Sequence, residues 1–452
     1  MSARDDAIPH EPRAHAPCDD ARVTAQDAPR DHRATAIVLG CAILAALVVC
    51  VIAARGDGSL LVPRNGGRPV GDTFWSWVFL ASLVGAFLVY VAAVVLAARG
   101  HIAVRLALAI GVAIQLAPLA SPLVLSTDAW TYWDYGRIAV VHDGNPYVDP
   151  PSAFPNDPAH AYVGARWADT PNVYGPLFTL GVAPIARVAG DSADAAAWMF
   201  KAIAALAMIA AMFGASRVAR RPTLAAIVVG WSPLLAIQAA GAGHNDAWIA
   251  ALAVGAIVAS RARRPMLAGA LWALAALVKW VPLLLVPLIG IAGIVRARSA
   301  QAIDAGTARR DLVRTLAGFV LAAGVGIAIA CVRYSTSWLA AFGPISRNAH
   351  TATGYSFAFR LNQLKLPDAA ARIIPLVVLA VAGLYVLRFA LRGRARIGLA
   401  ICALVACSPL IAPWYLLWAV PLAVTDEDDT LPVVLAMILT GALLVQGIPI
   451  HG

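Results

Sequence analysis

The sequence has few charged residues, which make up 13% of 452 residues, against 60% that are hydrophobic. No water-soluble fold needs so much apolar surface. The six cysteines lack the spacing of metal ligands, so neither a zinc site nor a disulfide framework is predicted. No Walker loop, dinucleotide fingerprint or GxSxG elbow occurs in a context that would support it. We therefore expect no metal and no cofactor, and any group donor is expected to come from within the membrane.

Apolar blocks long enough to cross a bilayer recur from Ala34 to the C-terminus. They predict an all-α, polytopic transmembrane bundle of about thirteen helices rather than a barrel. One domain, 34–448, would follow a disordered cytoplasmic tail, 1–33, and precede a short C-terminal end, 449–452. The expected spans are 34–54, 74–98, 103–124, 195–216, 222–240, 246–260, 265–279, 281–295, 314–332, 371–391, 396–412, 414–424 and 431–448.

The formal charge of +10 is carried by Lys and Arg clusters beside these apolar blocks, which indicates membrane topology rather than nucleic-acid binding. The positive-inside rule makes the clusters cytoplasmic, including the arginines expected in a loop at 296–314. The N-terminus is then cytoplasmic, and loops 125–194 and 333–370 face outward from the plasma membrane. Segment 174–190 is apolar enough to span, but spanning would move the next basic cluster outside. We therefore expect it to lie in the interface, within the first outer loop.

That outer loop opens on two carboxylates, Asp128 and Asp134, with Tyr135 and other aromatic residues around them. A carboxylate walled by aromatic rings at the membrane surface is partly desolvated and suited to act as a base. The alternative is ordinary: the rings form an interfacial belt and Asp128 caps a helix.

Two further polar features interrupt the apolar chain. The turn GHND places His244, Asn245 and Asp246 between two helices, where Asp246 could alternatively serve as a helix N-cap. Lys279 lies in ALWALAALVKWVPLLLVPL with no other charge nearby, and an embedded ionisable residue indicates function by default. The alternative for Lys279 is that it snorkels to the outer surface.

The last outer loop is rich in cationic side chains, which is unusual on the outer side. Arg347, His350 and Arg360 would suit a phosphate ligand, or alternatively anionic lipid headgroups. Beyond this loop, Trp414 and Tyr415 mark another outer helix junction, as an aromatic belt or as part of a pocket for a lipid-linked substrate.

Taken in order, these motifs resemble the GT-C superfamily of membrane glycosyltransferases. Within it the chain is similar to the bacterial polyprenol-phosphomannose-dependent α-(1→6)-mannosyltransferases. The matching stretches are STDAWTYWDYGRIAVVHDGNPY at 126–147, DTPNVYGPL at 169–177, GHND at 243–246, ALAALVKWVP at 273–282 and PWYLLW at 413–418. One departure is Trp130, where the family often has a tyrosine or an aliphatic residue. Related subgroups on the same skeleton use other sugars.

The resemblance implies an inverting transfer of a sugar, most simply mannose, from a polyprenyl-phosphate donor to a cell-envelope glycan or glycolipid on the outer face. Asp128 matches the position of the family's base. The candidates for binding the donor phosphate are Arg360, Arg347, Lys279 and His350. The candidates for binding the sugars are Asp134, Tyr135, Tyr174, His244, Asn245, Asp246, Trp414 and Tyr415.

The competing function is a transporter or flippase of a lipid-linked saccharide. Transporters usually carry polar groups near the bilayer midplane in helices repeated across two halves. This sequence shows no such repeat, and its polar clusters fall in the expected outer loops. The sequence therefore favours an enzyme acting at the membrane surface.

Overall fold

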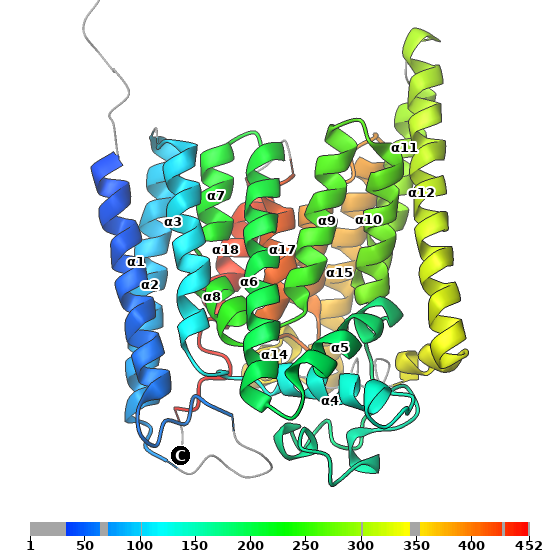
Figure 1. Cartoon of the computed structure of the whole chain (residues 1–452). Helices are drawn as coiled ribbons and strands as arrows, with labels where there is room; N and C mark the ends of the chain where they lie inside the picture. The colour runs from blue at the N-terminus through cyan, green and yellow to red at the C-terminus, as the bar shows by residue number, and fades with distance from the viewer. Residues whose placement is uncertain are drawn as a thin grey trace, which may run out of the picture.

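The computed structural model describes residues 33–63, 71–100, 102–299, 302–343, 353–426 and 430–450, without the side chains of 302–305. In these ranges the secondary structure is helical, apart from one isolated bridge between Ser59 and Asp72. The helices run mostly side by side in one bundle (Figure 1). The all-α prediction is confirmed. The predicted disordered tail falls almost wholly outside the described residues.

Six helices of the described ranges are long and apolar enough to cross a membrane. A seventh span results if one bent pair, α7 with α8 and η4, counts as one. The number of about thirteen spans stays a prediction, because several apolar helices are shorter than a full crossing. The six are α1 (Arg33–Arg55), α2 (Phe74–Arg99), α6 (Ala193–Val218), η5 with α11 (Val281–Ser299), α12 (Ala302–Tyr334) and α15 (Asp368–Ala390). The shorter ones are α3 with η1 (Val104–Ala120), α5 (Pro176–Ala189), α10 (Pro265–Val278), α16 (Ile397–Cys407) and α18 (Leu431–Leu443).

The centre of the bundle is built from small residues. α9 (Asp246–Arg261) packs against α6, α10 and α17 (Leu416–Ala423). Ala204 and Ala211 on α6 and Ala250 and Ala253 on α9 are fully buried. Without long side chains between them, helices can approach closely and gain van der Waals contact, which is the main attraction available in a lipid environment.

A bend between two helical segments positions the GHND turn. α7 (Pro222–Gly230) ends before Pro233, whose ring removes a backbone donor, and the next segment leaves at 52°. That segment consists of α8 (Pro233–Ala236) and the π-helical η4 (Ile237–Gly241). Gly243 then adopts φ +73°, and a Cβ there would lie 3.3 Å from both the Ala129 Cβ and the Lys201 amide nitrogen. Glycine is therefore required for the turn that presents His244.

α12 corrects one prediction. The basic stretch 296–314 was expected to be a cytoplasmic loop, yet α11 continues to Ser299 and α12 begins at Ala302. Alanine and arginine are strong helix formers, so a basic composition does not by itself end a helix.

Two short helices, α4 (Asp128–Val140) and α5, lie across the lower end of the bundle (Figure 1). Gly136 lets them touch, because a Cβ there would lie 2.6 Å from the Ala186 Cβ. That these helices lie in the membrane interface, within an outer loop, stays a prediction.

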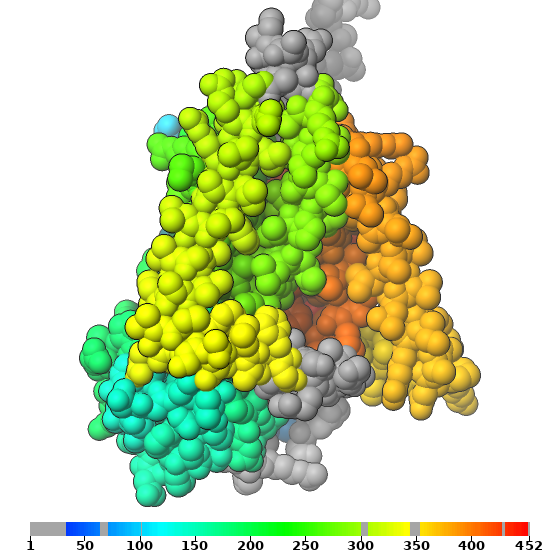
Figure 2. Space-filling view, turned by 90° about the vertical axis from the view of Figure 1, so that its right-hand side faces the viewer, coloured from blue at the N-terminus to red at the C-terminus, as the bar shows by residue number. Residues whose placement is uncertain are grey.

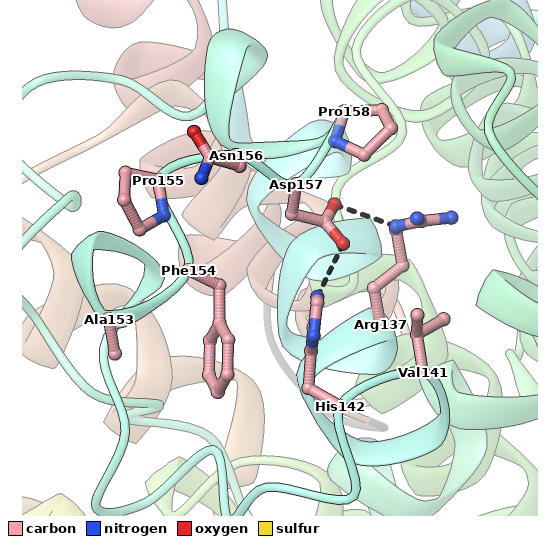
Figure 3. Close-up of a pocket in the computed structure, with 9 residues that line it drawn as sticks. All are labelled: Arg137, Val141, His142, Ala153, Phe154, Pro155, Asn156, Asp157 and Pro158. Atoms are coloured by element: carbon pink, nitrogen blue, oxygen red, sulfur yellow. Dashed lines mark hydrogen bonds and ion pairs between the residues drawn. The ribbon is translucent and has the colours of Figure 1, made fainter.

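Ion pairs fold the loop after α4 back onto that helix. The buried Asp157 accepts from Arg137 Nε at 2.7 Å and contacts His142 Nε2 at 2.6 Å (Figure 3). A cavity of about 380 Å³ lies beside these residues. Arg137 is nine residues after Asp128 on α4, a separation of about 180° around a helix, so this cavity and Asp128 lie on opposite sides of α4.

The face turned toward the viewer in Figure 2 is hollowed between α10, α11 and α12 on one side and α15 on the other. The floor of the hollow is formed by the later, orange-red part of the chain. At the opposite end of the bundle from α4, α11 and α15 come together, where Arg296 Nη1 donates to the Gly393 carbonyl oxygen at 2.8 Å. Away from that contact, the two helices border the hollow on opposite sides (Figure 2).

Candidate active site

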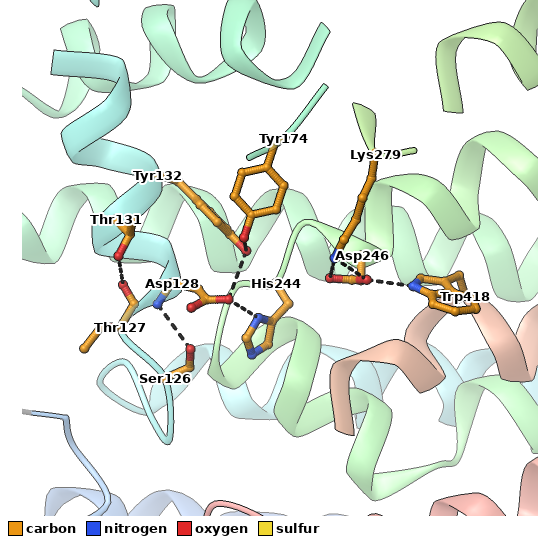
Figure 4. A network of polar contacts seen from close by, with 10 residues as sticks. All are labelled: Ser126, Thr127, Asp128, Thr131, Tyr132, Tyr174, His244, Asp246, Lys279 and Trp418. Atoms are coloured by element: carbon orange, nitrogen blue, oxygen red, sulfur yellow. Dashed lines mark hydrogen bonds and ion pairs between the residues drawn. The ribbon is translucent and has the colours of Figure 1, made fainter. Parts of the chain in front are cut away.

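Asp128 is the first residue of α4, and its carboxylate faces the GHND turn rather than the helix. Its amide nitrogen donates to Ser126 Oγ at 3.2 Å, and Thr127 occupies the N-cap position without a side-chain hydrogen bond. The carboxylate oxygen Oδ2 lies 3.3 Å from His244 Nδ1. Tyr132 Oη donates to the same oxygen at 3.4 Å (Figure 4). The interpretation of Asp128 as a simple helix cap is therefore wrong.

The environment of Asp128 favours its ionised form. The side chain is only 13% exposed, and burial alone would raise its pKa. The contact with His244 and the positive charge of Lys279 outweigh burial, so the pKa of Asp128 is lowered below its ordinary value. The group is consequently a carboxylate at neutral pH, which is the form that can accept a proton.

The second half of the site is an ion pair. Lys279 Nζ lies 2.9 Å from both carboxylate oxygens of Asp246, and Trp418 Nε1 donates to Asp246 Oδ1 at 2.6 Å. Asp246 is 1% exposed, and the Lys279 side chain is 17% exposed. Asp246 begins α9, but its oxygens are used by Lys279 and Trp418, so its expected alternative as an N-cap is also wrong.

Aromatic rings join the two halves. Lys279 Nζ lies over the rings of Tyr174 at 5.7 Å and Tyr415 at 5.3 Å, distances at which a cation attracts a ring face. Tyr174 meets Tyr132 edge to face, and His244 stacks on Trp414 with centroids 4.4 Å apart. The contacts close into a ring, here called the Asp128 circuit: Asp128, Tyr132, Tyr174, Lys279, Asp246, Trp418, Tyr415, Trp414 and His244.

Polar atoms beside the circuit have no hydrogen-bond partner among the described residues. They are both side-chain polar atoms of Asn245, which is 1% exposed, and His244 Nε2. A buried polar atom without a partner is costly and rare in native proteins. These atoms are therefore suited to bind the hydroxyl groups of a ligand.

The other predicted sugar-binding residues lie farther along α4. Tyr135 Oη donates to the Thr170 carbonyl oxygen at 2.8 Å and so holds the loop. Asp134 is six residues after Asp128, about 120° away around the helix, and faces Asp157 and Arg137. Burial and repulsion from Asp157 raise the pKa of Asp134 to about 7, while Arg137 offsets only part of this effect.

The predicted phosphate ligands are only partly brought together. Lys279 lies in the circuit. Arg360 lies on α14 (Phe357–Gln363), where its Nη1 donates to Gln363 Oε1 at 2.9 Å and its guanidinium stacks over Tyr355. Neither of these two interactions joins Arg360 to a residue of the circuit. Arg347 and His350 lie outside the described residues.

The sequence did not predict the contacts of two residues of the circuit, Tyr132 and Trp418, although both lie in aromatic stretches that it singled out. Tyr132 follows Asp128 by four positions, the spacing at which side chains meet on a helix, and this signal was available in the sequence. Trp418 is 172 residues from Asp246, so no local pattern could have paired them. Within the described ranges, no group of three or more His, Cys, Asp or Glu side chains is placed to hold a metal ion.

Comparison with known proteins identifies the family. The family model described as alpha-(1->6)-mannopyranosyltransferase, N-terminal domain, matches residues 34–295, which is more than half of the chain. This range runs from α1 into α11 and contains Asp128, the GHND turn and Lys279. No curated protein and no solved structure gives a match. The resemblance predicted from the motifs is thus confirmed, and the chain belongs to the alpha-(1->6)-mannopyranosyltransferase family.

Proposed function

We propose that the protein transfers mannose, with inversion, from a polyprenyl-phosphate donor to a hydroxyl group of a cell-envelope glycan or glycolipid. Membership of the family supports mannosyl transfer. The observation that carries the finer proposal is the Asp128 circuit. At one end of a membrane bundle it holds an ionised carboxylate, which does not serve as a helix cap, beside a cation.

Asp128 is the proposed general base. Its contacts with Tyr132 Oη and His244 Nδ1 both fall on Oδ2. In the reaction, the acceptor hydroxyl oxygen attacks the anomeric carbon of mannose and gives its proton to the Asp128 carboxylate. The bond from that carbon to the phosphate oxygen breaks, and its electron pair leaves with polyprenyl phosphate. Attack opposite the leaving group inverts the anomeric centre.

Lys279 is the proposed partner of the departing phosphate. An ammonium group has three N–H donors, and the two oxygens of Asp246 take two of them. The third can reach a phosphate oxygen, where a fixed cation stabilises the charge that develops on the leaving group. Asp246 would then act by holding Lys279 in position. Arg360, Arg347 and His350 stay proposed as further phosphate ligands.

The neighbouring polar and aromatic groups are proposed to bind the sugars. Asn245 and His244 Nε2 offer unpartnered hydrogen-bonding atoms. Tyr174, Trp414 and Tyr415 supply ring surfaces to the same circuit. Asp134 and Tyr135 lie farther along α4 and stay proposed for the extended part of an acceptor.

Two features support a lipid-linked donor on the outer face. The hollow of Figure 2 opens sideways between α11 and α15, and α15 carries exposed Leu376, Val377 and Val381 that suit an isoprenoid chain. Basic residues lie in or just beyond the last turns of α6, α9, α11 and α15, at the end of the bundle away from α4 and α5. By the positive-inside rule that end is cytoplasmic, and the circuit faces outward.

The proposal is tested with the purified chain in proteoliposomes, radiolabelled polyprenyl-phosphate-mannose and mannosylated glycan or glycolipid acceptors. We expect labelled acceptor with the natural protein and a loss of about 100-fold or more in the rate of transfer with Asp128→Asn. The matched control is Asp143→Asn, the same change in the same loop at a side chain that is 94% exposed. It should transfer at the natural rate.

Two outcomes would contradict the proposal. Full activity of a well-folded Asp128→Asn variant would remove Asp128 from the role of base. Movement of the labelled donor across the vesicle without any new glycosidic bond would instead favour the transporter.

A further inference from the structure

A second cavity lies at the end of the bundle away from the Asp128 circuit, between α11 and α12. It has a volume of about 480 Å³ and is lined by Ile294, Ala297, Arg298, Gly306, Arg309 and Leu312. The lining is mainly apolar, with one arginine from each helix. A cavity of this composition combines a site for negative charge with a wall suited to hydrocarbon.

The two arginines in this cavity differ from their basic neighbours. Arg296 donates to the Gly393 carbonyl oxygen, Arg310 donates to the Gly306 carbonyl oxygen, and Arg263 lies 3.7 Å from Asp311. Arg298 and Arg309 are exposed, and neither makes a hydrogen bond or ion pair with another described residue. Their guanidinium groups are therefore available to an anion, for which arginine is the preferred residue.

The outer surface of α12 continues the cavity along the membrane. Val313, Leu316 and Val320 are 58%, 62% and 60% exposed. They follow Arg309 by four, seven and eleven positions, which are close to whole turns, so all four residues lie on one face of α12. One face of the helix thus presents a cation at its end and an apolar stripe below it.

We propose that this cavity binds the phosphate headgroup of an anionic membrane lipid, with its acyl chains along the stripe of α12. Arg298 and Arg309 donate charge-assisted hydrogen bonds to the phosphate oxygens. Basic cavities between transmembrane helices on the cytoplasmic side are typical sites for anionic headgroups. Lipid binding at this cavity is separate from the transfer reaction, because no residue of the Asp128 circuit lines the cavity.

The test measures binding of short-chain phosphatidylglycerol to the full chain in detergent by native mass spectrometry. The variant is Arg298→Gln with Arg309→Gln. The control is Arg263→Gln with Arg392→Gln, which removes the same charge at the same end of the bundle, outside the cavity. All four positions are exposed, so the variants should keep the natural thermal midpoint in lipid-free detergent.

We expect the cavity variant to bind phosphatidylglycerol about 30-fold more weakly, which is about 2 kcal/mol at about 1 kcal/mol for each arginine. The control should bind like the natural protein, and phosphatidylcholine should bind less than phosphatidylglycerol. Three results would overturn the proposal. They are equal binding by the cavity variant, an equal loss in the control, and binding of free glycerol phosphate as tight as that of the lipid.

Discussion

Replacing Lys279 by methionine would leave the Asp246 carboxylate buried with only the Trp418 indole as a partner. Asp246 is 1% exposed, and its two oxygens now share one ammonium group at 2.9 Å. Removing one partner of a buried ion pair typically costs about 3–5 kcal/mol in the free energy of unfolding. We expect a loss near the lower end of that range, because the Lys279 side chain is 17% exposed and the Trp418 bond persists.

A second substitution separates this cost from any role in transfer. Adding Asp246→Asn to Lys279→Met removes the stranded charge while keeping an acceptor for Trp418. Neutral replacements of a whole buried ion pair are often tolerated, so the double variant should recover most of the lost stability. Its transfer activity should stay low, because no cation remains beside the proposed leaving phosphate.

Unfolding in mixed detergent micelles, followed by intrinsic fluorescence, gives the free energies of the natural protein, both single variants and the double variant. Mannose transfer is measured on the same preparations. The reasoning is refuted if the two single losses simply add in the double variant, since contacting partners must show a coupling energy. Recovery of transfer together with stability would refute the phosphate role of Lys279 and leave it a structural residue.

The remaining predictions concern Asp134 and Gly175. Because the pKa of Asp134 is raised in the folded protein to about 7, the folded state binds more protons than the unfolded state between the ordinary value of 3.8 and about 7, and stability falls as pH rises through that window. At pH values above 7, Asp134→Asn should therefore have a higher thermal midpoint than the natural protein, and this gain should vanish below pH 3.8. A gain independent of pH would contradict its origin in the ionisation of Asp134. A Cβ at Gly175 would lie 2.0 Å from the Leu277 carbonyl oxygen, so Gly175→Ala should push α5 from the end of α10, cost about 1–3 kcal/mol in stability and lower the rate of transfer. Gly181→Ala inside α5, with its nearest contact at 3.4 Å, is the matched control and should leave transfer unchanged without lowering the thermal midpoint, because alanine favours a helix over glycine.

The sequence predicted most helices within a few residues. α1, α2 and α9 begin and end close to the expected spans 34–54, 74–98 and 246–260. This succeeds because a membrane helix satisfies its own backbone hydrogen bonds, so a run of apolar residues is a local and nearly sufficient signal. The basic start of α12 was missed because charge indicates the side of the membrane, not where a helix begins.

The sequence by itself also singled out Asp128, the GHND turn and Lys279, because an ionisable group amid apolar residues is costly and rarely accidental. Only the tertiary structure decided how they combine. Lys279 pairs with Asp246 across 33 residues, and Trp418 reaches Asp246 across 172. Such pairings depend on the bend before Pro233 and on close packing at Gly243. These features set the distances between residues far apart in the chain, which neither composition nor sequence spacing predicts.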